Sequence, residues 1–320
     1  MSVLVSGAAG FIGCNLVKAL LDDGKHVVAF DNLSRGRVEY LRQFGNDPHF
    51  SFSVVDLADY DQLRAGLARV HSAEPIDEAW HLAANSDIPG GVSDPAVDLR
   101  DTFMTTFNLA RAMKDFGIPA LAFASSSAIY GDRPGITLTE STGPCLPISN
   151  YGAMKLASEG VISAAAESHL AQAFIFRFPN VVGAPATHGV IFDFIHRLRD
   201  NPSRLDVLGN GTQQKGYLHV DDLIGAMRFI RAQSRERVTC CNIGASDEGA
   251  TVRFIAEETV AAVAPGARIA FGEGDRGWVG DVPQFSLSVE KLHGMGWRPK
   301  LGSRDAIRRA IREIAAQDRP

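Results

Sequence analysis

Three glycines near the N-terminus constrain the fold more than any other feature of the sequence. Gly7, Gly10 and Gly13 follow a short apolar segment, Ser2–Ser6, and lead into the helically spaced segment Phe11–Asp22. Glycine permits a tight turn and a close approach to bare backbone, and a helix N-terminus offers free N–H groups and a positive dipole end. A GxxGxxG turn at a first strand–helix junction therefore predicts a dinucleotide-binding site.

Strand-like and helix-like segments alternate through the first half of the chain. Alternation of this kind predicts a parallel sheet covered on both faces, which is a doubly wound α/β fold. The expected strands are Ser2–Ser6, His26–Phe30, Phe50–Val55, Glu78–Leu82, Ala120–Ala124 and Gln172–Phe176. The expected helices are Phe11–Asp22, Tyr60–Val70, Asp98–Phe116 and Tyr151–Ser168.

The pattern changes after Pro179, where glycines and prolines divide the chain into shorter elements. Helical spacing recurs at 190–199, 221–231, 251–263 and 303–316. We expect residues 1–178 to form a Rossmann-type dinucleotide-binding domain, to which segments near 215–245 return. Residues 179–320 are expected to form a smaller mixed α/β lobe that binds the substrate.

Composition narrows the class of protein. Of 320 residues, 45% are hydrophobic and 22% charged, as in ordinary globular chains. A net charge of −5 provides no basic field for nucleic acid, and no apolar run reaches membrane-spanning length. The start of the chain lacks the features of a secretory leader, and the spacing of the four cysteines is typical of buried thiols in a reducing compartment. We therefore expect a cytoplasmic protein with neither a nucleic-acid nor a membrane partner, and we predict no metal site.

Acidic residues end the second and third expected strands. Asp31 is placed to accept hydrogen bonds from a ribose diol, and a carboxylate there repels a 2′-phosphate, so NAD is favoured over NADP. Arg35 and Arg37 follow closely and keep NADP open as an alternative, because guanidinium groups bind phosphate. Asp56 ends the third strand, where an adenine edge would lie. The alternative for Asp56 is a cap of the next helix.

A tyrosine and a lysine four residues apart follow a hydroxyl-rich strand end. Tyr151 and Lys155 share one face of the expected helix, and an ammonium group near a phenol lowers its pKa from an ordinary value of about 10. By itself this spacing also fits an exposed helix pair. Residues 125–131, Ser-Ser-Ser-Ala-Ile-Tyr-Gly, should lie at the carboxyl end of the fifth strand, where ligands collect. Together these features predict a Ser–Tyr–Lys group for proton transfer.

The motifs occur in the order found in the extended short-chain dehydrogenase/reductases. After the glycine turn and Asp31 come residues 81–84 (His-Leu-Ala-Ala), the serine-rich segment and the tyrosine–lysine pair. Four further segments resemble signatures that occur later in the sequences of this family: residues 177–183, 209–222, 242–244 and 296–299. Over nearly its whole length the chain resembles, within this family, the NAD-dependent UDP-galactose (UDP-glucose) 4-epimerases.

The resemblance implies roles for individual residues. Ser126 would be the catalytic serine, Tyr151 the base and Lys155 its electrostatic partner, which also binds the nicotinamide ribose. Thr102 stands where the family commonly has a cofactor-contacting asparagine. The implied NAD-binding residues are Gly7, Gly10, Phe11, Ile12, Gly13, Asp31, Asn32, Ser34, Arg35, Gly36, Asp56, Leu57, Leu82, Ala83, Ala84, Thr102, Tyr151, Lys155 and Pro179.

Substrate contacts are implied mainly in the second half of the chain. Asn180 would contact the substrate diphosphate, and Lys215 replaces the usual phosphate-binding arginine, which keeps the charge but loses bidentate geometry. Arg276 would supply a second cation, or else lie on the surface. Phe285 falls where a residue gates sugar size, or else belongs to the core. The implied substrate-binding residues are Ser126, Asn180, Val190, Leu208, Lys215 and Arg276.

The resemblance also implies the reaction, which is 4-epimerisation of a UDP-sugar through a 4-keto intermediate. UDP-glucose and UDP-galactose are the default substrates, with UDP-GlcNAc and UDP-glucuronate as alternatives. A 4,6-dehydratase or a decarboxylase would need acidic groups where Ser127 and Ala128 stand. A non-catalytic NAD-sensing regulator would not need the Ser–Tyr–Lys group. A homodimer is implied, through the helices around Tyr60–Val70 and Asp98–Phe116.

Overall fold

The computed structural model describes residues 1–275, 282 and 284–317. The chain forms two compact units. The first consists of residues 1–131, 143–177 and 227–241, and the second of residues 132–142, 178–226 and the described chain from 242 onward. Residues 132–142 belong to the second unit although the sequence pattern does not separate them from their neighbours.

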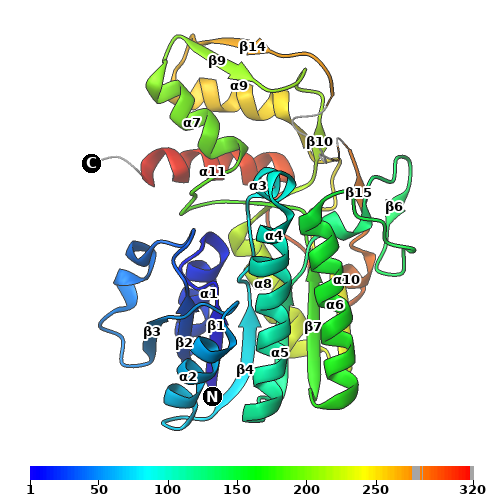
Figure 1. The fold of residues 1–320 in the computed structure, drawn as a ribbon. Coiled ribbons are helices and arrows are strands. Elements are labelled where there is room, and N and C mark those ends of the chain that lie inside the picture. The colour runs from blue at the N-terminus through cyan, green and yellow to red at the C-terminus, as the bar shows by residue number, and fades with distance from the viewer. Residues whose placement is uncertain (276–281, 283, 318–320) are drawn as a thin grey trace. The chain divides into compact units, whose positions relative to one another are not determined.

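A seven-stranded sheet forms the centre of the first unit (Figure 1). Its strands are β1 (Ser2–Ser6), β2 (His26–Asp31), β3 (Phe50–Val54), β4 (Ile76–His81), β5 (Ala120–Ala124), β7 (Gln172–Arg177) and β12 (Val238–Asn242). The order is β12-β7-β5-β4-β1-β2-β3. Each neighbouring pair of strands from β7 through to β3 is parallel. The chain order reverses between β1 and β4, and ligands of such sheets bind at the carboxyl ends of the strands beside this point. The predicted Rossmann-type fold is confirmed.

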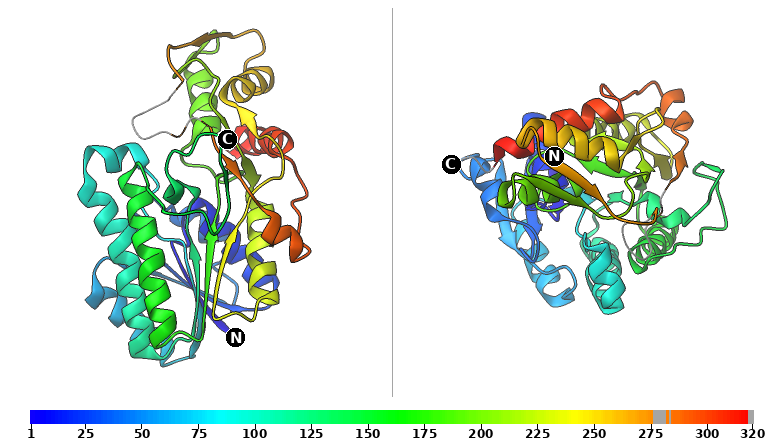
Figure 2. Two further views of the ribbon diagram at one scale, coloured as in Figure 1. Left: turned by 90° about the vertical axis from the view of Figure 1, so that its right-hand side faces the viewer. Right: turned by 90° about the horizontal axis from the view of Figure 1, so that it is seen from above.

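Helices cover both faces of this sheet, as Figure 2 shows. On one face α2 (Tyr60–His71) packs against α5 (Thr105–Phe116), which packs against α6 (Asn150–Ser168). On the other face lie α1 (Phe11–Asp22) and the last part of α8 (Val220–Gln233). The apolar core of this unit includes Leu4, Phe30, Leu63, Leu109 and Ile162. Burial of these side chains is the main force that holds the helices on the sheet.

The helix expected over Asp98–Phe116 is divided in the structure. It consists of α4 (Pro95–Asp98), a π-helical stretch η2 (Leu99–Met104) and α5. The hydroxyl of Thr105 donates to the carbonyl oxygen of Asp101 at 3.1 Å, and that of Thr106 donates to the carbonyl oxygen of Thr102 at 3.0 Å. These side-chain bonds satisfy carbonyl groups along the irregular ladder. Apolar periodicity alone does not register such a local change in hydrogen bonding.

Shorter elements build the second unit. Its helices are the first part of α8, α7 (Val190–Asp200), α9 (Val252–Val263), α10 (Glu290–Gly294) and α11 (Ser303–Gln317). Its strands pair two by two: β6 (Thr137–Leu138) with β15 (Ser286–Leu287), β8 (Asn180–Val182) with β11 (Tyr217–His219), β9 (Arg204–Val207) with β14 (Arg268–Phe271), and β10 (Gln214–Lys215) with β13 (Ala250–Thr251). A separate core includes Ile191, Ile195, Leu205, Ile255 and Ile307. The helices predicted here are confirmed, whereas strands of two to four residues are too short to show a period.

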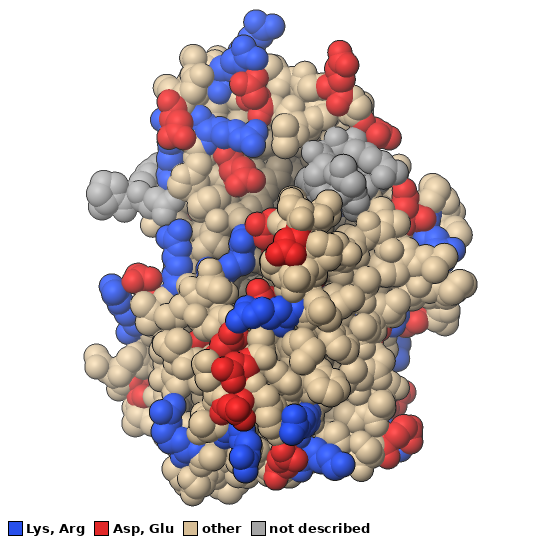
Figure 3. Space-filling model, viewed as in Figure 1, with Lys and Arg blue, Asp and Glu red and all other residues tan. Residues whose placement is uncertain are grey.

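Two surface properties complete the description. In the part of the chain that the structure describes, no helix combines the length and the apolar character needed to cross a membrane. On the face seen in Figure 3, lysine and arginine side chains are interspersed with aspartate and glutamate side chains.

Candidate active site

At Gly7 and Gly13 the turn between β1 and α1 is packed too closely for a side chain. A Cβ atom on Gly13 would lie 2.0 Å from the carbonyl oxygen of Gly7, and a Cβ atom on Gly7 would lie 2.6 Å from the nitrogen of Ala83. Gly7 also has a φ of 72°, which favours glycine. Gly10 precedes α1, and no side chain caps the first N–H groups of that helix. These groups can therefore bind an anion such as a pyrophosphate.

Asp31 ends β2 as a buried carboxylate held by backbone groups. Its Oδ2 accepts a hydrogen bond from the N–H of Ala9 at 2.9 Å, and its Oδ1 accepts one from the N–H of Leu33 at 2.8 Å. Burial raises the pKa of Asp31, and these two hydrogen bonds oppose the rise. A Cβ atom on Gly36 would lie 2.7 Å from Oδ1. The structure thus brings Asp31 against the glycine turn, which fits a ribose bound beside a pyrophosphate.

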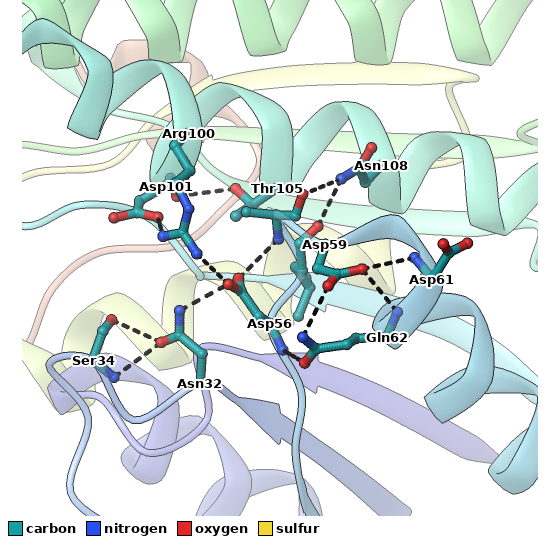
Figure 4. A network of polar contacts seen from close by, with 12 residues as sticks. Asn32, Ser34, Asp56, Asp59, Asp61, Gln62, Arg100, Asp101, Thr105 and Asn108 are labelled. Atoms are coloured by element: carbon teal, nitrogen blue, oxygen red, sulfur yellow. Dashed lines mark hydrogen bonds and ion pairs between the residues drawn. The ribbon is translucent and has the colours of Figure 1, made fainter.

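A polar network surrounds Asp56 beyond the end of β3 (Figure 4). Asp56 forms an ion pair with Arg100 of η2 and accepts a hydrogen bond from the Asn32 amide at 3.5 Å. The N-terminal cap of α2 is Asp59, whose side chain accepts from the N–H of Gln62 at 3.1 Å. The alternative interpretation of Asp56 as a helix cap is therefore wrong.

The other residues predicted to bind the cofactor lie in several settings. Ser34 hydrogen-bonds the Asn32 side chain, and Arg35 forms an ion pair with Asp87 at 3.3 Å. Thr102 is buried, and its hydroxyl accepts the N–H of Asn85 at 3.1 Å. Phe11 and Ile12 begin α1, and Leu57 is buried just beyond β3. The three residues Leu82, Ala83 and Ala84 directly follow β4. Pro179 belongs to the second unit.

Ser126, Tyr151 and Lys155 all belong to the first unit and lie on two elements that approach closely. Ser126 follows β5 and caps the short helix η3 (Ser127–Tyr130), where its Oγ accepts the N–H of Ala128 at 3.1 Å. Tyr151 and Lys155 lie in the first two turns of α6. A Cβ atom on Gly152 would lie 2.6 Å from the carbonyl oxygen of Ala128, so the start of α6 packs directly against η3.

Burial and mutual contacts set the acidity of this group. Burial raises the pKa of Tyr151 to about 12, and a hydrogen bond with Ser126 lowers it in part. Burial lowers the pKa of Lys155 to about 7. The Nζ of Lys155 donates to the carbonyl oxygen of Ala124 at 2.6 Å and lies 5.8 Å from the centre of the Tyr151 ring. A phenol beside an ammonium group can serve as a base once further positive charge lowers its pKa.

Several buried polar residues next to this group were not predicted from the sequence. Glu159 follows Lys155 by one helical turn, forms an ion pair with Arg177 at 2.6 Å and accepts a hydrogen bond from Ser125. His81 is fully buried, and its two ring nitrogens bond the hydroxyls of Ser6 and Thr106. Burial lowers the pKa of His81 to about 3, so the imidazole stays neutral. The i, i+4 spacing of Lys155 and Glu159 was a signal that could have identified Glu159.

The second unit brings two of the predicted substrate residues near each other. Asn180 opens β8 and lies opposite Tyr217 of β11 in a parallel pairing. Lys215 ends β10, only two residues before Tyr217, and pairs with Ala250 of β13. Asn180 is exposed and Lys215 is half-buried. Asn180 thus lies on the strand that pairs with β11, and Lys215 lies two residues before β11. An amide and an ammonium group in such positions can bind phosphate oxygens.

The remaining predicted substrate residues are spread over the second unit. Val190 begins α7 and is half-buried, and Leu208 follows β9 with 62% of its surface exposed. Phe285 is half-buried and immediately precedes β15. Arg276 lies outside the described residues. Among the described residues, no group of three or more His, Cys, Asp or Glu side chains is arranged to hold a metal ion.

Comparison with known proteins identifies the family. Residues 3–244 match the family described as the NAD dependent epimerase/dehydratase family. The chain belongs to this family. The UDP-glucose 4-epimerase of Lacticaseibacillus casei is 30% identical and covers 96% of this chain and 94% of its own length. The structure of Thermus thermophilus UDP-glucose 4-epimerase in complex with NAD is 30% identical and has a TM-score of 0.84, with 99% of each chain covered.

Other members similar to this chain carry the names of other sugars. The UDP-glucuronate 4-epimerase of Thermodesulfobacterium geofontis is 25% identical and covers 96% of this chain and 94% of its own length. The UDP-N-acetylglucosamine 4-epimerase from Methanobrevibacter ruminantium M1 is 26% identical, with a TM-score of 0.82 and coverage of 99% of this chain and 98% of its own. The predicted family and the predicted cofactor, NAD, are confirmed. The closely packed glycine turn and the buried Asp31 carboxylate fit this cofactor.

Proposed function

We propose that this family member is a nucleotide-sugar 4-epimerase that interconverts UDP-glucose and UDP-galactose. The observation that carries the proposal is the Ser126–Tyr151–Lys155 group, which shares one unit with the glycine turn and Asp31. The first unit would hold NAD and the catalytic group, and the second would hold the nucleotide sugar.

Tyr151 would exchange the proton of the sugar 4-hydroxyl. It takes this proton as the C4 alcohol becomes a ketone and returns it when the alcohol of opposite configuration forms. Bound NAD supplies the hydride acceptor and donor. With Lys155 in place the pKa of Tyr151 is about 12. The positive charge of a nicotinamide ring beside it would favour the phenolate and lower this pKa, and the ammonium form of Lys155 acts in the same direction. Ser126, hydrogen-bonded to Tyr151, can orient the hydroxyl or relay its proton.

The second unit would grip the diphosphate and leave the hexose free to turn. Lys215 offers a charge to the phosphate oxygens and Asn180 offers an amide, and Arg276 is proposed as a further cation. Strong contacts at the diphosphate with few directional contacts at the sugar allow both faces of the 4-keto sugar to be reduced. Phe285, if it faces the sugar, disfavours an N-acetyl group by its bulk.

The chain departs from what a 4,6-dehydratase would need. Expulsion of water from C5 and C6 requires an additional acid and base beside the catalytic hydroxyls. The two residues after Ser126 are Ser127 and Ala128, which begin η3, and neither side chain can act as a carboxylic acid. Epimerisation of UDP-GlcNAc or of UDP-glucuronate is the second candidate, because relatives of similar identity carry those names.

A product screen tests the proposal directly. The purified protein is incubated with UDP-galactose, UDP-GlcNAc and UDP-glucuronate without added cofactor, and the products are separated by chromatography. We expect UDP-galactose to yield UDP-glucose with retained NAD. Conversion of one of the other sugars alone would replace the substrate assignment. A stable keto product, or conversion of none of the sugars, would overturn the epimerase proposal.

We also propose a homodimer that forms through the helical face carrying α2 and α5. Leu99 and Phe107, on successive parts of η2 and α5, are 49% and 43% exposed, which is high for large apolar side chains. Light scattering of the protein as it elutes from a size-exclusion column measures its mass. A monomer at micromolar concentration would contradict this proposal.

A further inference from the structure

Glu159 continues the catalytic face of α6. Tyr151, Lys155 and Glu159 are spaced four residues apart, so they lie one above another on the helix. Glu159 is buried, with 6% of its surface exposed. Its Oε1 accepts a hydrogen bond from the Nε of Arg177 at 3.0 Å, and its Oε2 accepts one from Nη2 at 2.6 Å. The hydroxyl of Ser125 donates to Oε1 at 2.5 Å. The carboxylate is therefore held by a bidentate partner and a hydroxyl.

The ion pair joins the elements that carry the catalytic group. Arg177 ends β7, and its Nη1 donates to the hydroxyl of Tyr130 in η3 at 3.0 Å. Ser125 directly precedes Ser126 at the end of β5, and Glu159 lies on the helix of Tyr151. A single buried pair thus connects the end of β5, η3, α6 and the end of β7. Buried bidentate pairs of this kind are geometrically specific.

Lys155 is a buried cation and needs negative charge nearby. Its residue surface is 2% exposed, and its Nζ donates to the carbonyl oxygen of Ala124. Burial of an ammonium group without compensation favours the neutral amine. Burial is the largest influence on the pKa of Lys155, and Glu159 and then Asp98 oppose it. Glu159 is therefore the stronger of these two anionic influences on the ammonium form.

Other ionisable groups around Lys155 and Glu159 also influence the charge in this region. Asp98, at the end of α4, is buried and has a raised pKa, chiefly because of burial. His81 of β4 stays neutral because burial lowers its pKa to about 3. Tyr151 is a neutral phenol until it reacts, and the cation of Arg177 is balanced by Glu159. Loss of the Glu159 charge would leave Arg177 as a buried cation near the same helix face.

We propose that Glu159 is a positioning residue that favours the ammonium form of Lys155 and so helps Tyr151 to act as a base near neutral pH. The proposal rests on the proposed epimerase function, in which the ammonium group favours the phenolate. Glu159 touches neither substrate nor cofactor in this scheme. It acts through Lys155, and through Ser125 on the backbone of Ser126.

The direction of the pH effect follows from the charges. Glu159→Gln keeps the shape of the side chain and an oxygen for Ser125 but removes the negative charge. The protonated form of Lys155 is then disfavoured, so Lys155 loses its proton at lower pH, by about one unit. The alkaline limb of kcat moves down by the same amount. The acid limb, where Tyr151 must lose its proton while Lys155 is still protonated, does not move up, because the charge that is lost is negative and does not stabilise the phenolate.

The experiment measures the titration of Lys155 directly. Protein labelled with ¹³C at lysine Cε is titrated by NMR, and the Lys155 signal is assigned by its loss in Lys155→Arg. We expect the Lys155 midpoint to fall by about one pH unit in Glu159→Gln. We also expect the pH profile of kcat to narrow from its alkaline side, with KM for the nucleotide sugar little changed.

Glu78→Gln is the matched control. Glu78, on strand β4, is likewise a buried carboxylate paired with an arginine, since it accepts from Arg231 at 2.6 Å and from the indole of Trp80 at 2.9 Å. It pairs with Val3 and Ala120 near the starts of β1 and β5, away from the carboxyl ends of the strands. We expect this variant to lose stability without a shift of the Lys155 midpoint. Glu159→Asp retains the charge, so its Lys155 midpoint should lie close to that of the unaltered protein.

Two outcomes would overturn the proposal. One is an unmoved Lys155 midpoint in Glu159→Gln, and the other is an equal shift in Glu78→Gln. If Glu159→Gln does not fold, the double variant Glu159→Gln/Arg177→Met removes the buried guanidinium together with its partner, and the Lys155 midpoint is then read in that variant. The NMR titration needs no substrate, so it stands apart from the product screen. If the protein epimerises none of the sugars, the proposed function is contradicted, and this result is independent of the measured Lys155 midpoint.

Discussion

The residues proposed for catalysis in the first unit and those proposed for the substrate in the second unit lie in different settings. In the first unit Asp31, Lys155, Glu159 and Arg177 are all buried, and each has a backbone or side-chain partner at hydrogen-bond distance. In the second unit Asn180 and Lys215, which are proposed to bind the substrate, lie on strands of three and two residues, and Asn180 is exposed.

This difference matches two physical requirements. Proton transfer depends on fixed geometry and on charges held in a low-dielectric setting, which buried and fully partnered groups provide. Binding of a sugar that must present either face depends on a firm hold at the diphosphate and freedom elsewhere. Family members with different sugar names match this chain over 96% or more of its length. We infer that the chemistry belongs to the first unit and the choice of sugar to the second.

The largest expected effect comes from the catalytic group of the first unit. Tyr151→Phe removes only the phenolic hydroxyl, so kcat should fall by about 10²- to 10⁴-fold, the usual contribution of a general acid–base group. NAD retained after purification should be unchanged, as measured by release from denatured protein. Turnover equal to that of the unaltered protein would remove Tyr151 from its assigned role.

The next effect tests the rigidity of the glycine turn. In Gly13→Ala the new Cβ would lie 2.0 Å from the carbonyl oxygen of Gly7, so backbone must shift. We expect the free energy of unfolding to fall by about 1–3 kcal/mol and the retained NAD to drop, as measured by denaturant unfolding and cofactor release. Gly160→Ala in α6 is the control, because its Cβ would meet nothing within 4 Å. It should raise stability by about 0.5–1 kcal/mol. Full NAD retention in Gly13→Ala would contradict the tight-turn argument.

The third effect moves to the second unit. Lys215→Ala should raise KM for the nucleotide sugar by about 10- to 100-fold, because a charged contact to phosphate is lost. Retained NAD should not change, and Lys215→Arg should keep most of the affinity. Steady-state kinetics on the sugar identified by the product screen measure both variants. A fall in retained NAD without a change in KM would break the division of labour between the units.

The smallest expected effect concerns sugar size. Phe285→Ala should improve kcat/KM for UDP-GlcNAc by about tenfold relative to UDP-galactose, because side-chain bulk is removed at the proposed gate. Competition between the two sugars in one reaction measures the ratio. If Phe285 is ordinary core instead, the variant loses about 3–5 kcal/mol of stability and the ratio stays unchanged.

Local patterns made much of the fold predictable. The alternation of apolar runs with amphipathic segments is a property of neighbouring residues, so β1, α1, β5 and α6 could be located closely from sequence. The π-helical stretch within 99–104 and the strands of two to four residues in the second unit carry no period, and they were missed. Asp56 shows the same limit, because its contacts with Asn32 and Arg100 join separate elements that the local pattern does not bring together.

The sequence by itself determined the glycine turn, the strand–helix order and the Tyr151–Lys155 spacing, because each depends on residues a few positions apart. Only the tertiary structure decided which distant side chains meet. The bond from Ser125 to Glu159, the ion pair of Glu159 with Arg177 and the contact of Asp31 with Ala9 all join separate elements. The packing of helices on the sheet decides which side chains become neighbours. A buried polar group then forms its hydrogen bonds with those neighbours, because an unpaired polar group in the interior is costly.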